Sequence, residues 1–392
     1  MDKIEEILNR GVVNIIPDKK KLEYLLTSGK KLNIFLGIDP TATKIHLGHA
    51  FPLRKLQTFC ELGHNVTFLI GDFTTLIGDT SDKDSERPVL TTAQIEENFK
   101  TYKKQAEKIL DFTKVNVVYN SKWLKNLSFA EIVKLCEHFS AGDFVGRELI
   151  KKRLSEGKKV GLHELLYPVM QGYDSWFLDT DIQLGGTDQT FNMQAGRVLQ
   201  KDLRGKESYI IANSFLTGTD GRKMSKSWGN AVWLEDTPND MYGKIMSVKD
   251  DLIIEYYTLG TNVSLDEVDE IEKELKDGAN PMLLKKRLAF EVVSELYDQN
   301  QATEAQSFFE KTIQKSETPD DLPFITLPPG TTITQALVES KLADSNSQAR
   351  RLIEQKGVRI NDQTVTDAQK VLMPDSIINV GSRNYVKIII SG

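Results

Sequence analysis

Cysteine is scarce in this sequence, and long apolar runs are missing from it. The 392 residues include two cysteines, Cys60 and Cys136, each inside an apolar helical pattern. We therefore expect neither a disulfide framework nor a zinc site, and the expected compartment is a reducing cytoplasm. No stretch of about 18 uncharged apolar residues occurs, so we expect no transmembrane helix and no membrane partner. Residues 1–6 are acidic and amphipathic and lack the basic-then-apolar order of a signal peptide.

Basic residues are fewer than acidic ones, 50 against 56. The formal net charge is −6, which argues against nucleic-acid binding over the whole surface. From residue 333 onward, eight Lys and Arg stand against six Asp and Glu, a net +2 that leaves −8 for the rest of the chain. Any RNA contact is therefore expected at local basic patches. The apolar fraction of 40% and the length are those of a globular protein with two or three domains.

The first half of the chain alternates strand and helix patterns. We expect helices over residues 1–30, a helix from about His49, and buried strands at 33–38, 66–70, 115–119 and 209–211. Strand–helix–strand units of this length predict parallel pairing with right-handed crossovers. Ligands of such sheets bind beyond the carboxyl ends of the strands, where 37–41, 78–79 and 185–189 fall. No GxGxxG loop is present, so a nucleotide would be held by the histidine-bearing helix instead.

Composition and hydrophobic periodicity divide the whole chain into domains. We expect a catalytic domain over 1–232 with a mostly helical insertion at about 120–180, and a helical domain over 233–315. A proline-rich linker over 316–332 would then lead to a compact unit over 333–392. The insertion carries an apolar strip that is either plain core or a subunit interface, formed by Leu162, Leu165, Leu166, Val169 and Met170.

Two short motifs point to phosphate chemistry. His46-Leu47-Gly48-His49 places two imidazoles on one face of a helix N-terminus, where free backbone N–H groups attract phosphate. Gly48 allows a flat group to approach the backbone. Lys223-Met224-Ser225-Lys226-Ser227 places two lysines three residues apart in a loop. Taken singly, each motif is better explained without a function, the first as helix-face histidines beside a core and the second as a solvated basic turn.

The loop after Asp79 contains two further cations, Lys83 and Arg87. Cations on such a loop can stabilise the negative charge that develops on phosphate oxygens during the reaction. A solvated loop is the alternative.

A third pattern suggests an amino-acid pocket. On a helix, Tyr167, Gln171 and Asp174 lie at positions i, i+4 and i+7, hence on one face. Asp174 is suited to accept a hydrogen bond from a substrate phenol, and Tyr167, Gln171 and Asp79 to hold an α-ammonium group. A buried polar network that braces the helix is the alternative.

The order of these motifs resembles that of the bacterial tyrosyl-tRNA synthetases, which are class I aminoacyl-tRNA synthetases. The series runs Gly37-Ile38-Asp39-Pro40-Thr41, His46–His49, Tyr167–Asp174, Gly185-Gly186-Thr187-Asp188-Gln189 and Lys223–Ser227. The resemblance implies an α/β fold with a Rossmann-type parallel-sheet catalytic domain, an α-helical domain and a small α+β RNA-binding domain. It also implies a homodimer that joins L-tyrosine to tRNA(Tyr) through a tyrosyl-adenylate, with ATP as its Mg²⁺ complex and no dedicated metal site.

The resemblance also implies roles for individual residues. Those expected to bind tyrosine are Asp79, Asn120, Tyr167, Gln171, Asp174 and Gln189. Those expected to bind ATP are Gly37, Asp39, His46, Gly48, His49, Gly186, Asp188, Leu216, Lys223, Lys226 and Ser227. Those expected to act in catalysis are Thr41, His46, His49, Lys83, Arg87, Lys223 and Lys226. One position departs from the family pattern, because Phe35 stands where many members have a tyrosine that contacts the substrate hydroxyl.

The tail resembles a small RNA-binding module that is shared with a ribosomal protein and with pseudouridine synthases. Its helix is expected to begin at a Ser347 cap and to end at Gly357. The resemblance implies that this module binds the long variable arm of the tRNA. The residues expected to contact RNA are Arg350, Arg351, Lys356 and Arg359, with Arg383 as an extension. A solvated helix face is the alternative.

Two other functions stay open at this point. Tryptophanyl-tRNA synthetases share the catalytic fold, although Gln171, Asp174 and the tail favour tyrosine. A non-catalytic RNA-binding protein on a synthetase scaffold would be expected to lose the histidine or lysine motif, and both are intact.

Overall fold

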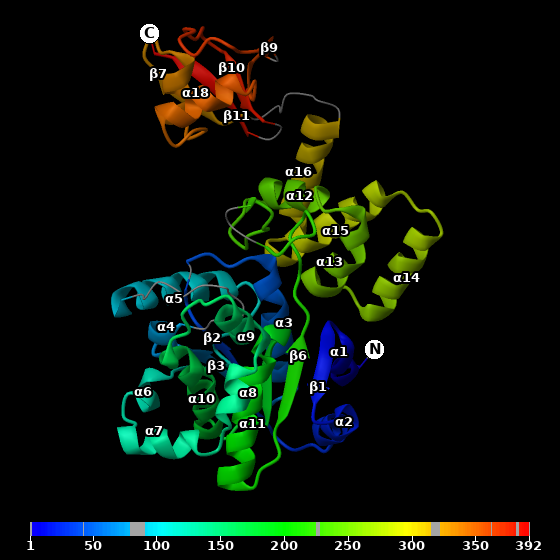
Figure 1. Ribbon diagram of the computed structural model, residues 1–392. Coiled ribbons are helices and arrows are strands. Elements are labelled where there is room, and N and C mark those ends of the chain that lie inside the picture. The colour runs from blue at the N-terminus through cyan, green and yellow to red at the C-terminus, as the bar shows by residue number, and fades with distance from the viewer. Residues whose placement is uncertain are drawn as a thin grey trace. The chain divides into compact units, whose positions relative to one another are not determined.

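A computed structural model describes residues 2–41, 43–78, 91–224, 228–314, 322–361, 363–381 and 384–391. These residues form two compact units (Figure 1). The first unit comprises residues 1–236 and 244–299, and the second comprises 237–243 and 300–392. No helix within the described ranges is long and apolar enough to cross a membrane.

The first unit is built on a six-stranded sheet with the order β1-β6-β5-β2-β3-β4. Five of its strands are parallel, and β1 pairs antiparallel with β6 at one edge. The four expected strands are confirmed, and β1 and β5 join them. The bounds are β1 (Val12–Ile16), β2 (Asn33–Ile38), β3 (Asn65–Ile70), β4 (Asn116–Tyr119), β5 (Ile182–Gly186) and β6 (Tyr209–Asn213).

The expected helices over 1–30 are present as two segments, Lys3–Asn9 and Lys19–Thr27, but the strand between them was not expected. Gly11 has a φ of +56°, which ends the first helix, and the β-branched residues after it form β1. A Cβ atom at Gly11 would also lie 2.4 Å from a methyl carbon of Leu259. In the sequence, Ile7, Leu8 and Val12 have the spacing of a helix, but Gly11 turns the chain between Leu8 and Val12.

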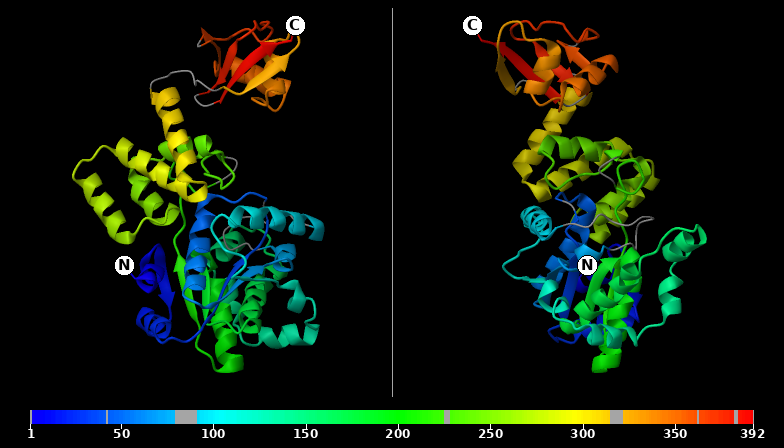
Figure 2. Two further views of the ribbon diagram at one scale, coloured as in Figure 1. Left: turned by 180° about the vertical axis from the view of Figure 1, so that it is seen from behind. Right: turned by 60° about the vertical axis from the view of Figure 1, so that its left-hand side comes forward.

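Helices flank this sheet in the two further views of Figure 2, and the helices of residues 253–296 pack against one another beyond it. Their bounds are α1 (Lys3–Asn9), α2 (Lys19–Thr27), α3 (Leu47–Glu61), α4 (Thr74–Ile77), α5 (Thr92–Ala106), α6 (Ser121–Leu124), α7 (Phe129–Cys136), α8 (Ala141–Val145), α9 (Glu148–Ser155), α10 (Leu162–Phe177), α11 (Thr190–Arg204), α13 (Ile253–Gly260), α14 (Leu265–Lys276) and α15 (Pro281–Leu296). The expected apolar strip divides on α10. Val169 is buried in the core, whereas Leu162 and Leu166 are exposed.

Helices of residues 244–299 pack within the first unit, although we expected a separate helical domain from 233. The Arg54 guanidinium on α3 donates to the carbonyl oxygens of Leu259 and Gly260 and pairs with Glu295 at 2.5 Å. A buried guanidinium requires such partners, so α3, α13 and α15 are held together. The functional domain boundaries stay predictions.

The second unit contains a five-stranded sheet with the order β7-β11-β10-β8-β9. The strands are β7 (Phe324–Leu327), β8 (Val358–Ile360), β9 (Gln363–Thr364), β10 (Ile377–Val380) and β11 (Asn384–Ile390). Two helices, α17 (Ile333–Glu339) and α18 (Asn346–Glu354), share a core with this sheet. α12 (Pro238–Met246) and α16 (Gln299–Phe309) complete the helices.

The expected linker over 316–332 is not wholly a linker. Its residues Phe324–Leu327 form β7, which lies between two prolines and pairs parallel with β11 at the sheet edge. Proline is compatible with such an edge, because one side of the strand makes no ladder hydrogen bonds.

Candidate active site

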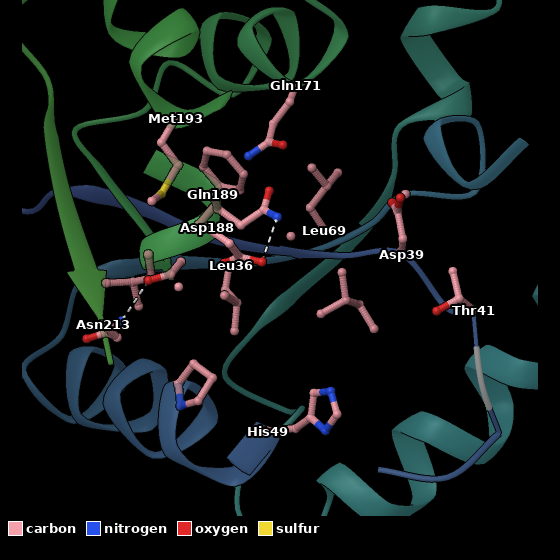
Figure 3. A pocket seen from close by; sticks show the side chains of 18 of the residues that line it. Leu36, Asp39, Thr41, His49, Leu69, Gln171, Asp188, Gln189, Met193 and Asn213 are labelled. Atoms are coloured by element: carbon pink, nitrogen blue, oxygen red, sulfur yellow. Dashed lines mark hydrogen bonds between the residues drawn. The ribbon is translucent and has the colours of Figure 1, made fainter. Parts of the chain in front are cut away.

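A cavity of about 410 Å³ lies where the strand order of the first sheet reverses, between β2 and β5 (Figure 3). Ligands of open parallel sheets bind at this switch point. Each predicted site residue of the catalytic unit that the structure describes lines this cavity. They are Gly37, Asp39, Thr41, His46, Gly48, His49, Asn120, Tyr167, Gln171, Asp174, Gly186, Asp188, Gln189, Leu216 and Lys223. The other predictions fall outside the described residues, namely Asp79, Lys83, Arg87, Lys226 and Ser227.

The two histidines lie at the N-terminus of α3, with ring centroids 3.9 Å apart. Nδ1 of His49 accepts a hydrogen bond from the backbone N–H of His46 at 3.2 Å. The neutral ring of His49 therefore carries its proton on Nε2, so its free ring nitrogen is a donor. Figure 3 shows the His49 ring at the edge of the cavity.

Both imidazoles are neutral at physiological pH. Burial lowers the pKa of His49 to about 4, and burial with the neighbouring His49 and Lys223 lowers the pKa of His46 to about 2. We expected these residue types to supply positive charge or hydrogen-bond donors. The structure favours donors for the histidines, and the ammonium group of Lys223 for the charge.

Backbone pairing brings the lysine loop to the histidines. The N–H of Leu47 donates to the carbonyl of Val232 at 2.8 Å, and that of Leu234 donates to Ile45 at 3.1 Å. Lys223 itself pairs with Thr217 in an antiparallel bridge. Two motifs that lie about 180 residues apart in the sequence therefore line one cavity.

Gly48 leaves little space for a side chain. A Cβ atom there would lie 3.1 Å from both Cε1 and Nδ1 of His46. Glycine thus lets the His46 ring lie close to the helix N-terminus.

The opposite end of the cavity is built around Asp174 on α10. The indole Nε1–H of Trp123 donates to its Oδ1 at 2.7 Å, and Nδ2 of Asn120 donates to its Oδ2 at 3.1 Å. Burial, and to a smaller extent the charges of Asp39 and Asp72, raise the pKa of Asp174 to about 8, although the two hydrogen bonds lower it.

A chain of hydrogen bonds joins Asp174 to Asp39. Asn120 also donates to the hydroxyl oxygen of Thr74 at 3.0 Å, and that hydroxyl donates to Oδ1 of Asp39 at 2.9 Å. The Tyr167 hydroxyl donates to Oδ2 of Asp39 at 2.9 Å. Asp39 was predicted among the ATP-binding residues, but its carboxylate here contacts Tyr167, a residue predicted to bind tyrosine.

The third side of the cavity follows β5. Gln189 donates to the Asp188 carboxylate at 3.3 Å and accepts a hydrogen bond from Asn192 at 3.0 Å. Figure 3 shows the side chains of Gln189, Asp188 and Leu36 close to one another. A Cβ atom at Gly186 would lie 2.6 Å from the Phe215 ring, so glycine permits the close approach of that ring.

Phe35 also lines the cavity and is buried among Leu69, Trp123 and Leu124. The position at which the sequence departs from the family pattern is therefore part of an apolar wall.

Sequence reasoning missed three residues that shape this site, namely Thr74, Tyr102 and Trp123. Trp123 follows the predicted Asn120 by three residues, which was a usable signal because the pair lies on one helical turn. Thr74 and Tyr102 gave no such signal, since their partners Asp39 and His49 are remote in the sequence.

The predicted RNA-binding residues lie in the second unit. Arg350 and Arg351 are exposed on α18, and Lys356 and Arg359 are exposed after it. The expected helix ends were wrong, because Ser345 caps α18 and Lys356 adopts the left-handed φ of +57° that we expected at Gly357. Arg383 falls outside the described residues.

No cluster of three or more His, Cys, Asp or Glu side chains that could hold a metal ion occurs in the described part of the chain.

Comparison with known proteins divides the chain near residue 314. Residues 27–314 match the class I tRNA synthetases for tryptophan and tyrosine (W and Y), and residues 314–385 match the SYY-like C-terminal domain of tyrosine–tRNA ligases. The chain is 40% identical to the tyrosine–tRNA ligase of Dehalococcoides mccartyi, over 98% of both proteins. It is 39% identical to that of Thermotoga maritima, over 98% of this chain and 96% of the relative.

Solved structures share the fold. A C-terminally truncated mitochondrial tyrosyl-tRNA synthetase from Aspergillus nidulans superposes with a TM-score of 0.64 at 22% identity, covering 78% of this chain and 92% of that one. The tyrosyl-tRNA synthetase of Archaeoglobus fulgidus, solved in complex with L-tyrosine, has a TM-score of 0.60 at 22% identity and covers 78% and 100%.

Proposed function

Because the chain belongs to the class I tRNA synthetases for tryptophan and tyrosine, and within them to the tyrosine–tRNA ligases, we propose a role for each side of its cavity. The enzyme uses ATP to join tyrosine to tRNA. The observation that carries the assignment is that a single cavity is lined by the histidine pair, the β5 turn and the Asp174 network together. We assign these to the triphosphate, the adenosine and the tyrosine, respectively.

Adenylate formation needs alignment more than a protein nucleophile. The tyrosine carboxylate is ionised near neutral pH and attacks the α-phosphorus of ATP, while the bond from that phosphorus to the pyrophosphate oxygen breaks. His46 and His49 donate neutral hydrogen bonds to phosphate oxygens, and Lys223 supplies positive charge where negative charge grows. Thr41, which lines the same cavity, adds a hydroxyl donor.

In the second step, a hydroxyl of the terminal tRNA adenosine attacks the carbonyl carbon of the adenylate and AMP leaves. Asp188 and the glycine backbone at 186 hold the adenosine during both steps. Lys226 and Ser227 are assigned to ATP by their motif alone, as are Lys83 and Arg87 to the pyrophosphate.

The tyrosine side chain is assigned to the cavity end at Asp174. A carboxylate held by Asn120 and Trp123 is oriented to accept the phenol hydrogen, whereas Tyr167 and Gln171 on the same helix face the α-ammonium. Asp39 acts with Tyr167 at that end, through their 2.9 Å bond. Because Phe35 has no hydroxyl group, Asp174 is the one hydrogen-bond partner that we assign to the phenol of the substrate.

We also propose that the enzyme is a homodimer that acts in the cytoplasm on ATP complexed with Mg²⁺. Exposed apolar side chains on neighbouring helices support the dimer, since Phe129 on α7 is 82% exposed and Leu162 on α10 is 80% exposed. Both cysteines are free thiols, which suits a reducing compartment. Sedimentation of the wild type and a Phe129→Asp variant tests the dimer, and a monomeric wild type would contradict it.

Tyrosine-dependent ATP–pyrophosphate exchange tests the site assignment. We expect His49→Asn to lower the exchange rate with little change in the KM for tyrosine, and Asp174→Ala to act mainly on tyrosine. If both variants exchange at the wild-type rate, the assignment of this cavity is wrong.

A further inference from the structure

One face of α5 fastens the segment that leads from β2 to the histidine-bearing helix. Asn98, Tyr102 and Gln105 lie at positions i, i+4 and i+7 and therefore share this face. Nδ2 of Asn98 donates to the carbonyl of Pro40 at 2.8 Å. Gln105 makes hydrogen bonds farther along the same segment, and the ring of Tyr102 packs against His49 just after it.

Gln105 binds the segment twice, and it is buried. Its Nε2 donates to the carbonyl of Thr43 at 2.7 Å, and its Oε1 accepts from the N–H of Ile45 at 2.9 Å. These groups lie immediately before His46, the first residue of the motif. The amide therefore fixes the point at which the chain enters α3.

Tyr102 reaches the histidines directly. Its ring is buried between Phe68 on β3, at a centroid distance of 5.9 Å, and His49, at 6.4 Å with the planes 77° apart. Such edge-to-face packing is favourable and depends on ring orientation. It limits rotation of the imidazole, whose Nδ1 must stay on the His46 N–H for Nε2 to remain a donor.

We propose that this face of α5 positions the histidine pair for the triphosphate, and that Tyr102 is a positioning residue that holds the His49 ring. The inference rests on the proposed role of His49 in adenylate formation. Tyr102 acts through His49, so its loss affects the chemical step more than tyrosine binding. A small misplacement of an aligned group lowers the rate strongly.

The test is pyrophosphate exchange by the full-length enzyme with Tyr102→Leu, Tyr102→Phe and Gln105→Leu. We expect Tyr102→Leu and Gln105→Leu to lower kcat about tenfold while the KM for tyrosine stays within about twofold. Tyr102→Phe keeps the ring and should retain most of the wild-type kcat.

Phe99→Leu is the matched control. Phe99 is buried on the same helix but packs against Tyr119 on β4 at a centroid distance of 5.6 Å, not against a histidine. It should lose thermal stability as Tyr102→Leu does, yet keep kcat. Equal losses of kcat in both variants, or a rise in tyrosine KM at constant kcat in Tyr102→Leu, would overturn the inference.

His49→Asn separates this inference from the function on which it depends. If His49→Asn exchanges normally, the proposed role of the histidine fails. If His49→Asn is impaired and Tyr102→Leu is not, only the positioning role of Tyr102 fails.

Discussion

The indole of Trp123 donates its Nε1–H to Oδ1 of Asp174 across 2.7 Å, and both side chains are buried. The same indole stacks on Phe177 at a centroid distance of 4.4 Å with the planes 18° apart, which fixes its direction. With Asn120 on the other oxygen, the carboxylate can turn toward neither solvent nor another partner without losing a bond. Its remaining acceptor positions are therefore directed by the protein before tyrosine binds, and this orientation lowers the entropy cost of binding.

Trp123→Phe tests this orientation, because phenylalanine keeps the stacking but removes the donor. Losing a buried hydrogen bond that orients this carboxyl group should raise the KM for tyrosine about tenfold, with kcat largely retained. Trp176→Phe is the control, since the Trp176 indole nitrogen is buried with no hydrogen-bond partner among the described atoms. Steady-state exchange kinetics of the two variants measure the difference. An equal KM in both would show that the Trp123 bond does not prepare the pocket.

Asp174→Asn tests recognition of the substrate hydroxyl. The amide matches the carboxylate in shape, but its NH₂ group would face the donors of Asn120 or Trp123. A site built to bond a substrate hydroxyl rejects the analogue that lacks it, a behaviour already established for this enzyme family. We expect the preference for tyrosine over phenylalanine, measured as the ratio of kcat/KM, to fall about a hundredfold or more. A ratio that stays at the wild-type value would place phenol recognition elsewhere.

Tyrosine binding should depend on pH through the same carboxyl group. Its pKa is about 8 in the folded protein, mainly because of burial, against 3.8 ordinarily. The ionised carboxylate is a stronger acceptor for the phenol hydrogen than the protonated acid, so the KM for tyrosine should fall as pH rises toward 8, by at most about tenfold per pH unit. The Asp174→Asn variant should lack this slope.

The raised pKa of Asp174 makes the stability of the free protein fall with rising pH, whereas tyrosine binding tightens. The unfolded chain loses this proton near pH 3.8 and the folded chain only near pH 8, so the folded state binds the extra proton between them. The contribution of Asp174 to stability without tyrosine therefore falls as pH rises across that window. Thermal unfolding at several pH values measures it, and a wild-type slope equal to that of Asp174→Asn would contradict the shift.

The sequence predicted much of the fold and site because local patterns carried the relevant information. Buried parallel strands are apolar runs, and β2 and β3 were found within one residue of their bounds. The His46, Tyr167 and Lys223 motifs were predicted to share a site, and they line one cavity.

What escaped prediction depends on contacts between distant segments. β1 is a strand because it pairs with β6, about 200 residues later, and because Gly11 turns the chain before it. Thr74 matters because it bridges Asn120 and Asp39, a relation that no spacing in the sequence expresses. The neutral state of the histidines likewise follows from burial that only the folded chain creates.

Gly48→Ala should separate stability from activity. Gly48 is the second residue of α3, where alanine gains less over glycine than the roughly 0.5–1 kcal/mol of a helix interior, so the melting temperature should change little. The new Cβ would lie 3.1 Å from the His46 ring, which must move by a few tenths of an ångström. We expect kcat for pyrophosphate exchange to fall severalfold or more. Gly142→Ala, whose nearest neighbour is the Ser140 hydroxyl at 3.5 Å, is the control and should leave exchange unchanged.

The proposed RNA contacts of α18 can be tested without disturbing the cavity. Arg350 and Arg351 are exposed on this helix, so a double alanine variant should fold normally and exchange pyrophosphate at the wild-type rate. If both guanidinium groups bind phosphates, kcat/KM for tRNA should fall and the slope of log K against log salt should decrease in magnitude by about 1.4–1.8. A Lys341→Ala, Lys370→Ala variant removes two exposed cations elsewhere in the same unit and serves as the control. Equal losses of kcat/KM for tRNA in the two double variants would mean that the net charge of this unit, and not the α18 surface, attracts the tRNA. A direct contact between α18 and the tRNA requires a larger loss in the Arg350, Arg351 variant than in the control.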